Sequence, residues 1–308
     1  TKQSSWPNSV MTNHQASHSG AFLSLTTMPT IQQAITQAVQ LLAGNHDADA
    51  YFDAEVLLCH LLGKNRSHLI AWPDKPLSDE QWHTFQTLIN RRATGEPVAY
   101  ITGHREFWSL DLLVSPATLI PRPDTEVLVE QALARIPIDA EWQIADLGTG
   151  SGAIALAVAS ERPHCQLFAI DISAEALDIA KQNAQRLKLS NITFLQGSWL
   201  APLTQHPLNM VLSNPPYIEA CDPHLNEGDV RFEPSGALAS GSDGLDDIRI
   251  LINTARQQLL PGGWLLMEHG YHQAQAIMDL MQQQGYSEIK DICDYGGNDR
   301  VACGCFKG

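Results

Sequence analysis

Apolar residues recur at helical spacing across residues 30–95. One stripe is formed by Ile31, Ile35, Ala38 and Leu42, and a second by Ala54, Leu57, Leu58, Leu61 and Leu62. Thr30 stands where it can cap the first helix, and Gly63 can end the second. The run 78–81, Ser-Asp-Glu-Gln, has the form of a capping box. We therefore expect a small all-helical N-terminal domain over residues 28–103.

The pattern changes after the sequence Gly-Glu-Pro at 95–97. Residues 107–114 alternate enough between apolar and polar side chains to predict a short hairpin. Asp124 or Thr125 can then cap an amphipathic helix. The apolar face of that helix consists of Leu128, Val129, Ala132 and Leu133. We interpret residues 104–125 as a hairpin linker between two domains.

From about residue 142 onward, apolar strands alternate with helices. Strands are expected at 144–147, 167–171, 192–195, 210–213 and 264–268, with two more between Gly285 and Cys303. Helices are expected at 153–160, 174–187 and 246–260. Near-continuous apolar strands separated by helices are typical of a doubly wound, mostly parallel sheet covered on both faces. Residues 126–308 are thus predicted to form an α/β domain with a seven-stranded sheet.

The composition bears on the location of the protein and on its membrane and metal partners. Residues 1–27 are rich in Ser, Thr, Gln, Asn and His, and we interpret them as a disordered extension or tag. No apolar run approaches the roughly 18 residues of a membrane helix, so no membrane partner is expected. The six cysteines form no CxxC pair and no zinc-like spacing with histidine. This usage favours reduced thiols in a cytoplasmic protein and predicts no metal.

The charge balance is strongly acidic. The chain holds 19 Lys and Arg residues against 34 Asp and Glu residues, a net charge of −15. Residues 106–308 hold 12 of the basic and 26 of the acidic residues, and so carry −14 of that charge. A protein that binds nucleic acid usually presents a basic face. A nucleic-acid partner is therefore not expected.

A glycine-rich turn, Asp146-Leu-Gly-Thr-Gly-Ser-Gly152, follows the first strand of the predicted sheet. Ligands of open α/β sheets bind outside the carboxyl ends of strands, so the location suits a cofactor. Gly148, Gly150 and Ala153 also satisfy the dinucleotide pattern G-x-G-x-x-A, which leaves a nicotinamide cofactor open. A carboxylate at Asp146 would repel a pyrophosphate, however. S-adenosylmethionine carries a sulfonium and an ammonium and no phosphate, so the charge favours it, and we expect Asp146 to be one of the residues that bind it.

Two further residues lie where the cofactor is expected. Asp171 ends the second strand and is placed to accept both ribose hydroxyls. Trp199, just after the third strand, is placed to lie against the adenine, although a single tryptophan there is also an ordinary core residue.

The run Asn214-Pro215-Pro216-Tyr217 directly follows the fourth strand. Pro216 restricts the residue before it, and the two prolines remove N–H donors that would compete with a ligand. The Asn214 side-chain oxygen and the Pro215 carbonyl then form an array of acceptors beside the aromatic face of Tyr217. Such an array can hold a planar –NH2 group by both hydrogens and align its nitrogen for methyl transfer, while Tyr217 would stack on the planar group. We expect Asn214, Pro215 and Tyr217 to be catalytic, and the whole run to bind the substrate.

Five segments together give the chain a family resemblance. They are Pro121–Glu126, Asp146–Gly152, Asn214–Tyr217, Val230–Pro234 and Asp294–Arg300. With them, residues 29–308 resemble the bacterial peptide chain release factor glutamine N5-methyltransferases, a branch of the class I S-adenosylmethionine-dependent methyltransferases. The resemblance implies the class I sheet, S-adenosylmethionine as cofactor and S-adenosylhomocysteine as product. It implies a substrate glutamine in the Gly-Gly-Gln motif of class 1 release factors, with the helical domain helping to hold that partner.

The resemblance also implies site residues. The cofactor residues of the family fall on Gly148, Thr149, Gly150, Ser151, Gly152, Asp171, Trp199 and Asn214. Many class I enzymes have an acidic residue near the adenine amino group at the end of the third strand. Here Ser198 offers only a hydroxyl, so we assign that contact to Ser198 as a departure from the pattern.

Other functions remain open from the residues alone. The same chemistry serves methylation of a ribosomal-protein glutamine or of the N6 nitrogen of adenine in nucleic acid, although the charge disfavours nucleic acid. A nicotinamide-dependent oxidoreductase is disfavoured by Asp146, and a non-catalytic adaptor by the intact acceptor array. Arg122 and Glu126 are interpreted as pins for the linker rather than pocket residues. Glu268 and His269 suggest a metal or general-base site, but no further ligand lies near them in sequence.

Overall fold

A computed structural model describes residues 28–43, 49–204 and 206–308 of the chain. The predicted extension over residues 1–27 lies outside the described residues. In the part that is described, no helix is both long and apolar enough to cross a membrane.

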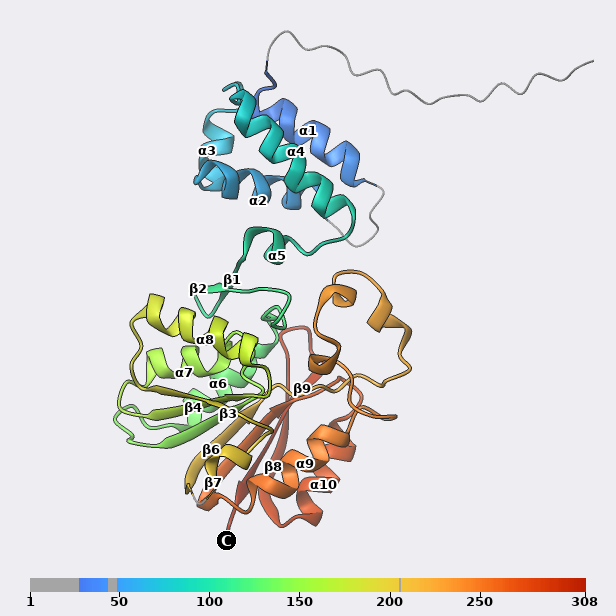
Figure 1. Cartoon of the computed structure of the whole chain (residues 1–308). Coiled ribbons are helices and arrows are strands. Elements are labelled where there is room, and N and C mark those ends of the chain that lie inside the picture. Colours follow the sequence, from blue (N-terminus) through green and yellow to red (C-terminus); the bar gives the residue numbers. More distant parts are fainter. Residues whose placement is uncertain (1–27, 44–48, 205) are drawn as a thin grey trace, which may run out of the picture.

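The N-terminal part is helical, as predicted (Figure 1). Its helices are α1 (Ile31–Leu42), α2 (Ala50–Leu62), α3 (Arg66–Ala71), α4 (Asp79–Ala93) and α5 (Val98–Thr102). Thr30 and Gln33 form a capping box at the start of α1, and Ser78 and Gln81 form another at α4. Gly63 ends α2 in the left-handed conformation that favours glycine. The predicted stripes of α1 and α2 pack with Phe85 and Ile89 of α4 into a separate core.

A two-stranded hairpin joins this part to the sheet. Its strands are β1 (His104–Phe107) and β2 (Leu110–Leu113), and they pair antiparallel. The hairpin was predicted, but it begins three residues earlier than the alternating pattern. Trp108 and Ser109 form its two-residue turn with φ of 53° and 58°, the mirror-image turn geometry that matches strand twist. The side-chain amide of Asn183 bonds both the N–H and the carbonyl of Leu113, at 2.7 and 2.9 Å, and so anchors the hairpin.

The remaining residues build a seven-stranded sheet in the order β5-β4-β3-β6-β7-β9-β8. The strands are β3 (Gln143–Leu147), β4 (Gln166–Asp171), β5 (Ile192–Gln196), β6 (Leu208–Ser213), β7 (Leu259–Glu268), β8 (Tyr286–Cys293) and β9 (Asp299–Phe306). The helices are α6 (Thr125–Arg135), α7 (Ala153–Glu161), α8 (Ala174–Leu187), α9 (Asp246–Ala255) and α10 (Ala274–Gln283). In this order the strands β5, β4, β3, β6 and β7 pair in parallel, and β9 pairs antiparallel with both β7 and β8. The predicted class of fold is confirmed.

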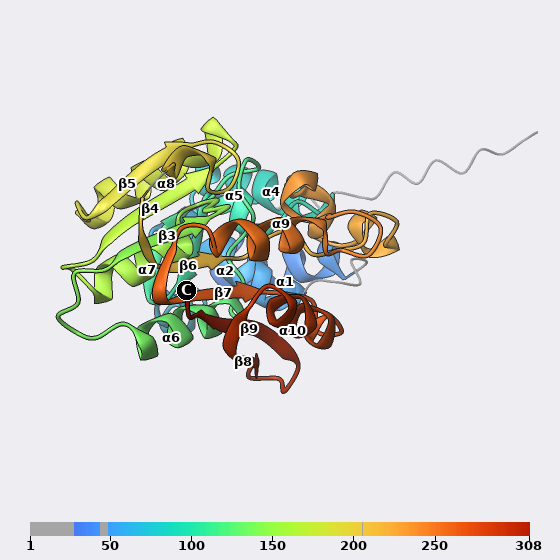
Figure 2. The ribbon, with the colours of Figure 1, turned by 90° about the horizontal axis from the view of Figure 1, so that it is seen from below.

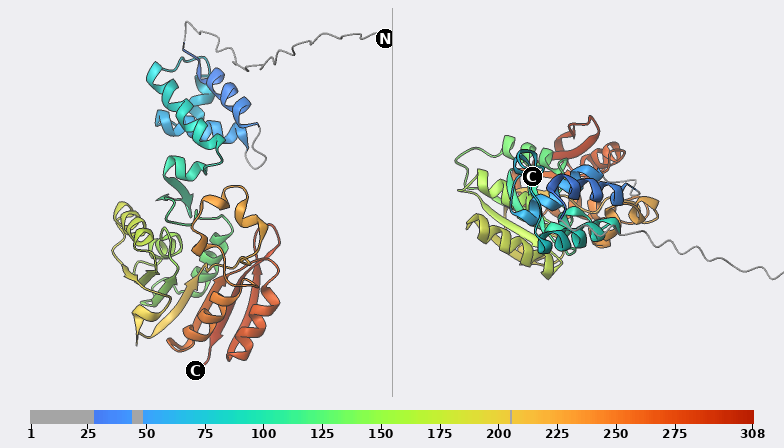
Figure 3. Two further views of the ribbon diagram at one scale, coloured as in Figure 1. Left: turned by 45° about the vertical axis from the view of Figure 1, so that its right-hand side comes forward. Right: turned by 90° about the horizontal axis from the view of Figure 1, so that it is seen from above.

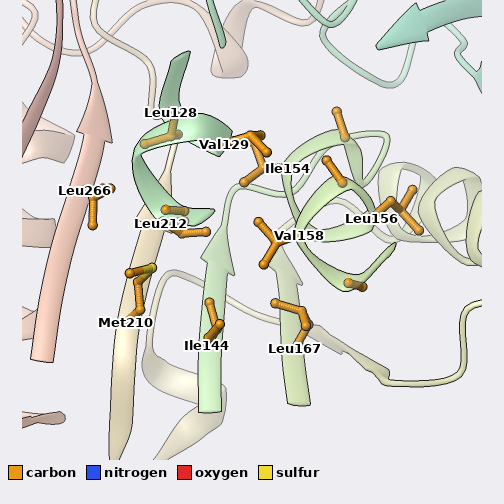
Figure 4. Close-up of a cluster of buried hydrophobic side chains, with 14 of the residues drawn as sticks. Leu128, Val129, Ile144, Ile154, Leu156, Val158, Leu167, Met210, Leu212 and Leu266 are labelled. Atoms are coloured by element: carbon orange, nitrogen blue, oxygen red, sulfur yellow. The ribbon is translucent and has the colours of Figure 1, made fainter. Parts of the chain in front are cut away.

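Helices cover both faces of this sheet (Figure 2). Helices α6, α7 and α8 pack against one face, and α9 and α10 against the other. Successive strand residues point to opposite faces, so Ile144 belongs to the first core and Ala145 to the second. Figure 4 shows the first core between helices and sheet, where the labelled sheet residues are Ile144, Leu167, Met210, Leu212 and Leu266.

The predicted end of α9 and the predicted start of β7 are both wrong. The helix expected to reach residue 260 ends at Ala255, and β7 begins at Leu259 instead of Trp264. The last buried residue of α9 is Ala255, and the exposed Arg256 and Gln257 follow. Leu259 pairs with Leu208 and Trp264 with Met210, so the Pro-Gly-Gly at 261–263 lies in an irregularity within the strand pairing.

The segment 214–245, between β6 and α9, reaches the helical part (Figures 1 and 3). It contains the short 3-10 helices η2 (Pro223–Asn226), η3 (Val230–Phe232) and η4 (Ser235–Ala237); a fourth, η1 (Ala201–Leu203), follows β5. Arg92 of α4 bonds Asp229 at 2.8 Å and, within its own domain, Asp53 at 2.7 Å. Arg231 donates to the carbonyl of Thr94 at 2.9 Å. These polar contacts join the segment to the helical part.

Neighbouring leucines at the end of α1 give a matched test of the helical core. Leu42 is fully buried, whereas the side chain of Leu41 is 54% exposed. Leu42→Ala should lower the free energy of unfolding by about 2–5 kcal/mol, because it leaves a cavity in the core. Leu41→Ala should change it by about 0.5 kcal/mol or less. Urea unfolding followed by circular dichroism measures both, and equal losses would contradict this packing.

Candidate cofactor and substrate site

A cavity of about 460 Å³ opens where the parallel strands end. Four strands contribute to its wall: residues 148–151 follow β3, 171–173 include the end of β4, 197–199 follow β5, and Asn214 and Pro216 follow β6. The rest of the wall comes from the linker, the segment after β6 and the first turns of α6, α7, α8 and α9. These lining residues are Ala117, Thr118, Leu119, Pro121, Thr125, Ala153, Ile154, Ala176, Pro234, Gly236, Ala237 and Asp247. The predicted glycine site and two residues of the predicted substrate run, Asn214 and Pro216, therefore lie in one cavity.

The glycines after β3 have the conformation that their type allows. Gly148, Gly150 and Gly152 have φ of 71°, 57° and 86°, in the left-handed region. A Cβ on Gly152 would lie 2.9 Å from the Leu156 side chain and 3.2 Å from that of Ala180. Gly152 is therefore needed for packing beneath α7, and Gly148, Thr149, Gly150 and Ser151 line the cavity.

Asp171 lines the cavity and fixes the glycine turn. One carboxylate oxygen accepts from the Gly150 N–H and the other from the Ser173 N–H, both at 2.9 Å. Each oxygen keeps a second lone pair for a ligand. A carboxylate held in this way is suited to accept two neighbouring hydroxyls.

Asp146 was expected beside the cofactor, but it lies beneath the glycine turn. It is completely buried beneath the turn and does not line the cavity. Its Oδ2 accepts from the Thr149 hydroxyl at 2.6 Å and from the Ala155 N–H at 3.2 Å. Burial raises the pKa of this carboxyl to about 7, although both hydrogen bonds oppose the shift. Asp146 therefore supports Thr149 from below.

The charge of the cavity discriminates between cofactors. Among the described residues that line it, the charged side chains are Asp171 and Asp247, and neither Lys nor Arg is present. Such a wall favours a cationic ligand and disfavours a pyrophosphate. The acidic lining thus fits S-adenosylmethionine, with its sulfonium and ammonium, better than a nicotinamide dinucleotide.

Trp199 lies against the glycine turn. Its ring carbon Cζ3 is 3.6 Å from the position that a Cβ on Gly148 would take. The backbone of Trp199 has φ of 48°, an uncommon value for a non-glycine residue. Both Trp199 and Ser198 line the cavity, next to Gly197. The predicted adenine neighbours are therefore on the wall, and no carboxylate takes their place directly after β5.

The four residues of the acceptor array point in different directions. Asn214 and Pro216 line the cavity, whereas Pro215 is buried and Tyr217 is absent from the lining. The Tyr217 hydroxyl donates to Glu268 Oε1 at 3.2 Å. Burial raises the pKa of Tyr217 and the neighbouring Glu268 carboxylate adds to the shift. The expected stacking of Tyr217 on a substrate amide stays a prediction.

Thr125 and Glu268 contact the substrate run in a way that was not predicted from the sequence. Thr125 accepts from Asn214 Nδ2 at 3.2 Å and donates to Glu268 Oε2 at 2.6 Å. Asp124 or Thr125 was expected to cap α6, and the N-cap is Asp124, although it makes no side-chain hydrogen bond. No local sequence signal joins Thr125 to Glu268, which is 143 residues away.

The other polar candidates lie outside the cavity. Arg122 pairs with the buried Glu233 of the segment after β6, and Glu126 accepts from the Trp108 N–H at 2.9 Å. Both residues therefore pin the linker, as interpreted. His269 is buried, with Nε2 2.6 Å from Asp291 Oδ1, and neither His269 nor Glu268 lines the cavity.

Comparison with known proteins matches both halves of the chain. Residues 33–103 match the family model described as PrmC N-terminal domain, and residues 138–305 match a methyltransferase domain. A Salmonella typhimurium protein named release factor glutamine methyltransferase is 52% identical over 254 residues, which are 82% of this chain and 91% of the relative. A Vibrio cholerae protein of the same name is 50% identical over 279 residues, 90% and 97% of the two chains.

A solved structure supports the fold. A methyltransferase from Pyrococcus furiosus aligns with a TM-score of 0.51 and 18% sequence identity, over 71% of this chain and 98% of the other. At that identity the likeness concerns the architecture alone.

The buried Asp146 predicts a pH dependence of stability. Its pKa is about 7 when folded and near 3.8 in an unfolded chain, so the folded state binds the extra proton between these values. The stabilisation from this proton is complete below pH 4 and is lost as the pH rises through 7. Asp146→Asn stays uncharged, so relative to wild type it should gain stability, on the order of a few kcal/mol, between pH 5 and 8.

Denaturant unfolding at several pH values measures this difference. The exposed Asp139→Asn is the matched control and should differ from wild type by a constant amount. A pH-independent difference for Asp146→Asn would contradict the assignment.

Proposed function

The chain belongs to the release factor glutamine methyltransferase family, and from that premise we propose its reaction and substrate. It transfers a methyl group from S-adenosylmethionine to the side-chain amide nitrogen, N5, of the glutamine in the Gly-Gly-Gln motif of class 1 peptide chain release factors. The observation that carries this proposal is the single cavity in which the acidic glycine site meets Asn214.

The residues that would hold the cofactor follow from the cavity wall. Gly148, Thr149, Gly150 and Ser151 would allow close backbone approach. Asp171 would accept the ribose hydroxyls, and Ser198 and Trp199 would border the adenine, since all these residues line the cavity. Asp146 and Gly152 support them from beneath the turn. When bound, S-adenosylmethionine supplies a methyl group on a positively charged sulfur. The lining contains neither His nor Cys within the described chain, and we propose that no metal takes part.

The acceptors after β6 act on the substrate amide. An amide nitrogen is a poor nucleophile because its lone pair is delocalised into the carbonyl. Asn214 Oδ1 and the Pro215 carbonyl would accept its two hydrogens, which increases the electron density on nitrogen and fixes the direction of the attack. The nitrogen would bond the methyl carbon as the sulfur–methyl bond breaks, with that electron pair left on the sulfur of S-adenosylhomocysteine, and the nitrogen would lose one proton past these acceptors to water. The reaction depends mainly on placement, so no strong base is required.

We also propose a division of labour along the chain. Residues 28–103 form a substrate-binding domain, 104–125 a linker, and 126–308 the catalytic domain. The contacts of Arg92 and Arg231 join the helical part to the segment after β6, which lines the cavity. A release factor held by the helical part would therefore lie close to the cavity. A cytoplasmic location agrees with a partner in translation termination.

The first experiment identifies the methyl acceptor. Labelled S-adenosylmethionine is incubated with the protein and, separately, a class 1 release factor, ribosomal protein or DNA, followed by mass mapping. We expect label on the Gly-Gly-Gln glutamine. Label on a ribosomal-protein glutamine would change the substrate. Label on the N6 nitrogen of adenine would overturn the choice of an amide; the −14 charge of residues 106–308 argues against that nucleic-acid outcome.

The acceptor role of Asn214 has a direct test. Asn214→Ala should reduce kcat for release factor methylation by about a hundredfold or more, because one of two amide acceptors is lost. Cofactor affinity by calorimetry should stay within about tenfold, since the glycine turn is untouched. Near wild-type turnover would exclude the amide clamp.

Asp171 tests the cofactor side separately. Asp171→Ala should weaken S-adenosylmethionine binding by about tenfold or more, because it removes the hydroxyl acceptor and two bonds that fix the turn. Calorimetric titration measures the effect. Unchanged affinity would show that the ribose contact is assigned to the wrong residue.

A further inference from the structure

The buried Glu268 carboxylate bonds one end of the Asn214–Tyr217 run directly, at Tyr217, and is linked to the other end through Thr125. Its residue is 1% exposed and ends β7. Oε2 accepts from the Thr125 hydroxyl at 2.6 Å, and Oε1 accepts from the Tyr217 hydroxyl at 3.2 Å. Thr125 in turn contacts Asn214. Both outer residues of the Asn-Pro-Pro-Tyr run are therefore linked to one side chain on the neighbouring strand.

Counting protons fixes the direction of these bonds. A threonine hydroxyl has one hydrogen, and the short contact with Glu268 Oε2 takes it. Toward Asn214, 3.2 Å away, Thr125 can then act only as an acceptor. The end of the Asn214 amide that faces Thr125 must be Nδ2, the donor. Oδ1 is left as the acceptor end of the planar group.

This direction matters because an asparagine amide can turn over. The two ends of the amide have nearly the same shape and opposite hydrogen-bonding character. If the Thr125 hydrogen were free, Thr125 could donate to Asn214 Oδ1, and the Nδ2 donor would then face the substrate. A donor facing the substrate –NH2 would repel the hydrogens that it has to hold.

We infer that Glu268 is a positioning residue for methyl transfer: through Thr125 it keeps Asn214 Oδ1 directed as an acceptor, and through its second oxygen it holds Tyr217. This inference rests on the proposed function. Glu268 touches neither the substrate nor the cofactor in this role. It acts by fixing the proton on Thr125 and the position of the Tyr217 hydroxyl.

A cation near Glu268 favours the carboxylate form that this role needs. Burial raises the pKa of Glu268, and Thr125, the Arg300 charge and Tyr217 oppose that shift. Arg300 bonds Asp294 Oδ2 at 3.1 Å and the His269 carbonyl at 3.1 Å. Asp294 also accepts from the N–H groups of Gly296 and Asn298. The Asp-Tyr-Gly-Gly-Asn-Asp-Arg run thus holds Arg300 in the neighbourhood of Glu268.

Four single variants test the inference with release factor as substrate. Glu268→Gln can offer only one acceptor oxygen, and Thr125→Val has the shape of threonine without its hydroxyl. Each should lower kcat by about 10- to 100-fold, as displaced reacting groups do, with S-adenosylmethionine affinity within about twofold. Thr125→Ser keeps the hydroxyl and should restore kcat to within about twofold of wild type. Glu175→Gln, an exposed residue on α8, is the matched control and should be unchanged.

The double variant separates positioning from general damage. If Glu268 acts through Thr125, Thr125→Val with Glu268→Gln should be little slower than the slower single variant. Wild-type kcat in both single variants, or equal loss in Thr125→Ser and Thr125→Val, would overturn the inference. If Glu268→Gln does not fold, as judged by circular dichroism, Thr125→Val against Thr125→Ser decides alone.

The same assay distinguishes the two proposals. If wild type and Glu175→Gln fail to methylate the release factor, the proposed function is wrong, and the inference that rests on it is withdrawn with it. If wild type is active and the Glu268 and Thr125 variants are equally active, only the positioning role is wrong.

Discussion

The reversal of strand order between β3 and β6 is the constraint on which the site depends. From β3 the chain runs outward to β4 and β5, and then returns to place β6 on the other side of β3. The loops after β3 and β6 must therefore part in opposite directions, which leaves a crevice at the carboxyl ends of the strands. The glycine turn occupies one side of the crevice and Asn214 the other. A methyl donor and a methyl acceptor can meet there because the topology keeps that space open.

Buried carboxylates hold the walls of this crevice in place. Asp146 supports the glycine turn, Glu268 holds the residues after β6, and Glu233 anchors the segment above them to Arg122 and the linker. Removing a carboxylate from water is costly unless it is bonded, and each of the three has bonds to side-chain or backbone donors. These three carboxylates, which the sequence alone could suggest as catalytic or ligand-binding groups, thus serve mainly to orient their neighbours.

The segment after β6 connects the two proposed roles of the chain. It begins with the acceptor array, lines the cavity through Pro234, Gly236 and Ala237, and reaches the helical part through Asp229 and Arg231. The Arg92 side chain at that junction is only 5% exposed, and it bonds Asp53 in its own domain as well as Asp229. A buried cation shared between two carboxylates fixes the approach of the two parts more firmly than exposed pairs would.

The sequence by itself determined the elements and the chemistry of the loops. Helix caps at Thr30 and Ser78, and the left-handed glycine at 63, depend on contacts within a few residues, so local pattern was enough to predict them. The glycine turn and Asn214 were found in the same way, because strand ends and turn residues carry their own signals. The resemblance of five segments to one family added the substrate, which local physics could not supply.

The tertiary structure alone decided how those residues act. The sequence placed Asp146 beside the cofactor, but packing buries it completely and turns it toward Thr149. Glu268 looked like a metal ligand or base without partners, and folding brought it to Thr125 and Tyr217, 143 and 51 residues away. The physical reason is that a side chain takes its role from the donors, acceptors and solvent around it. In a doubly wound sheet these neighbours come from distant strands, so no local pattern contains them.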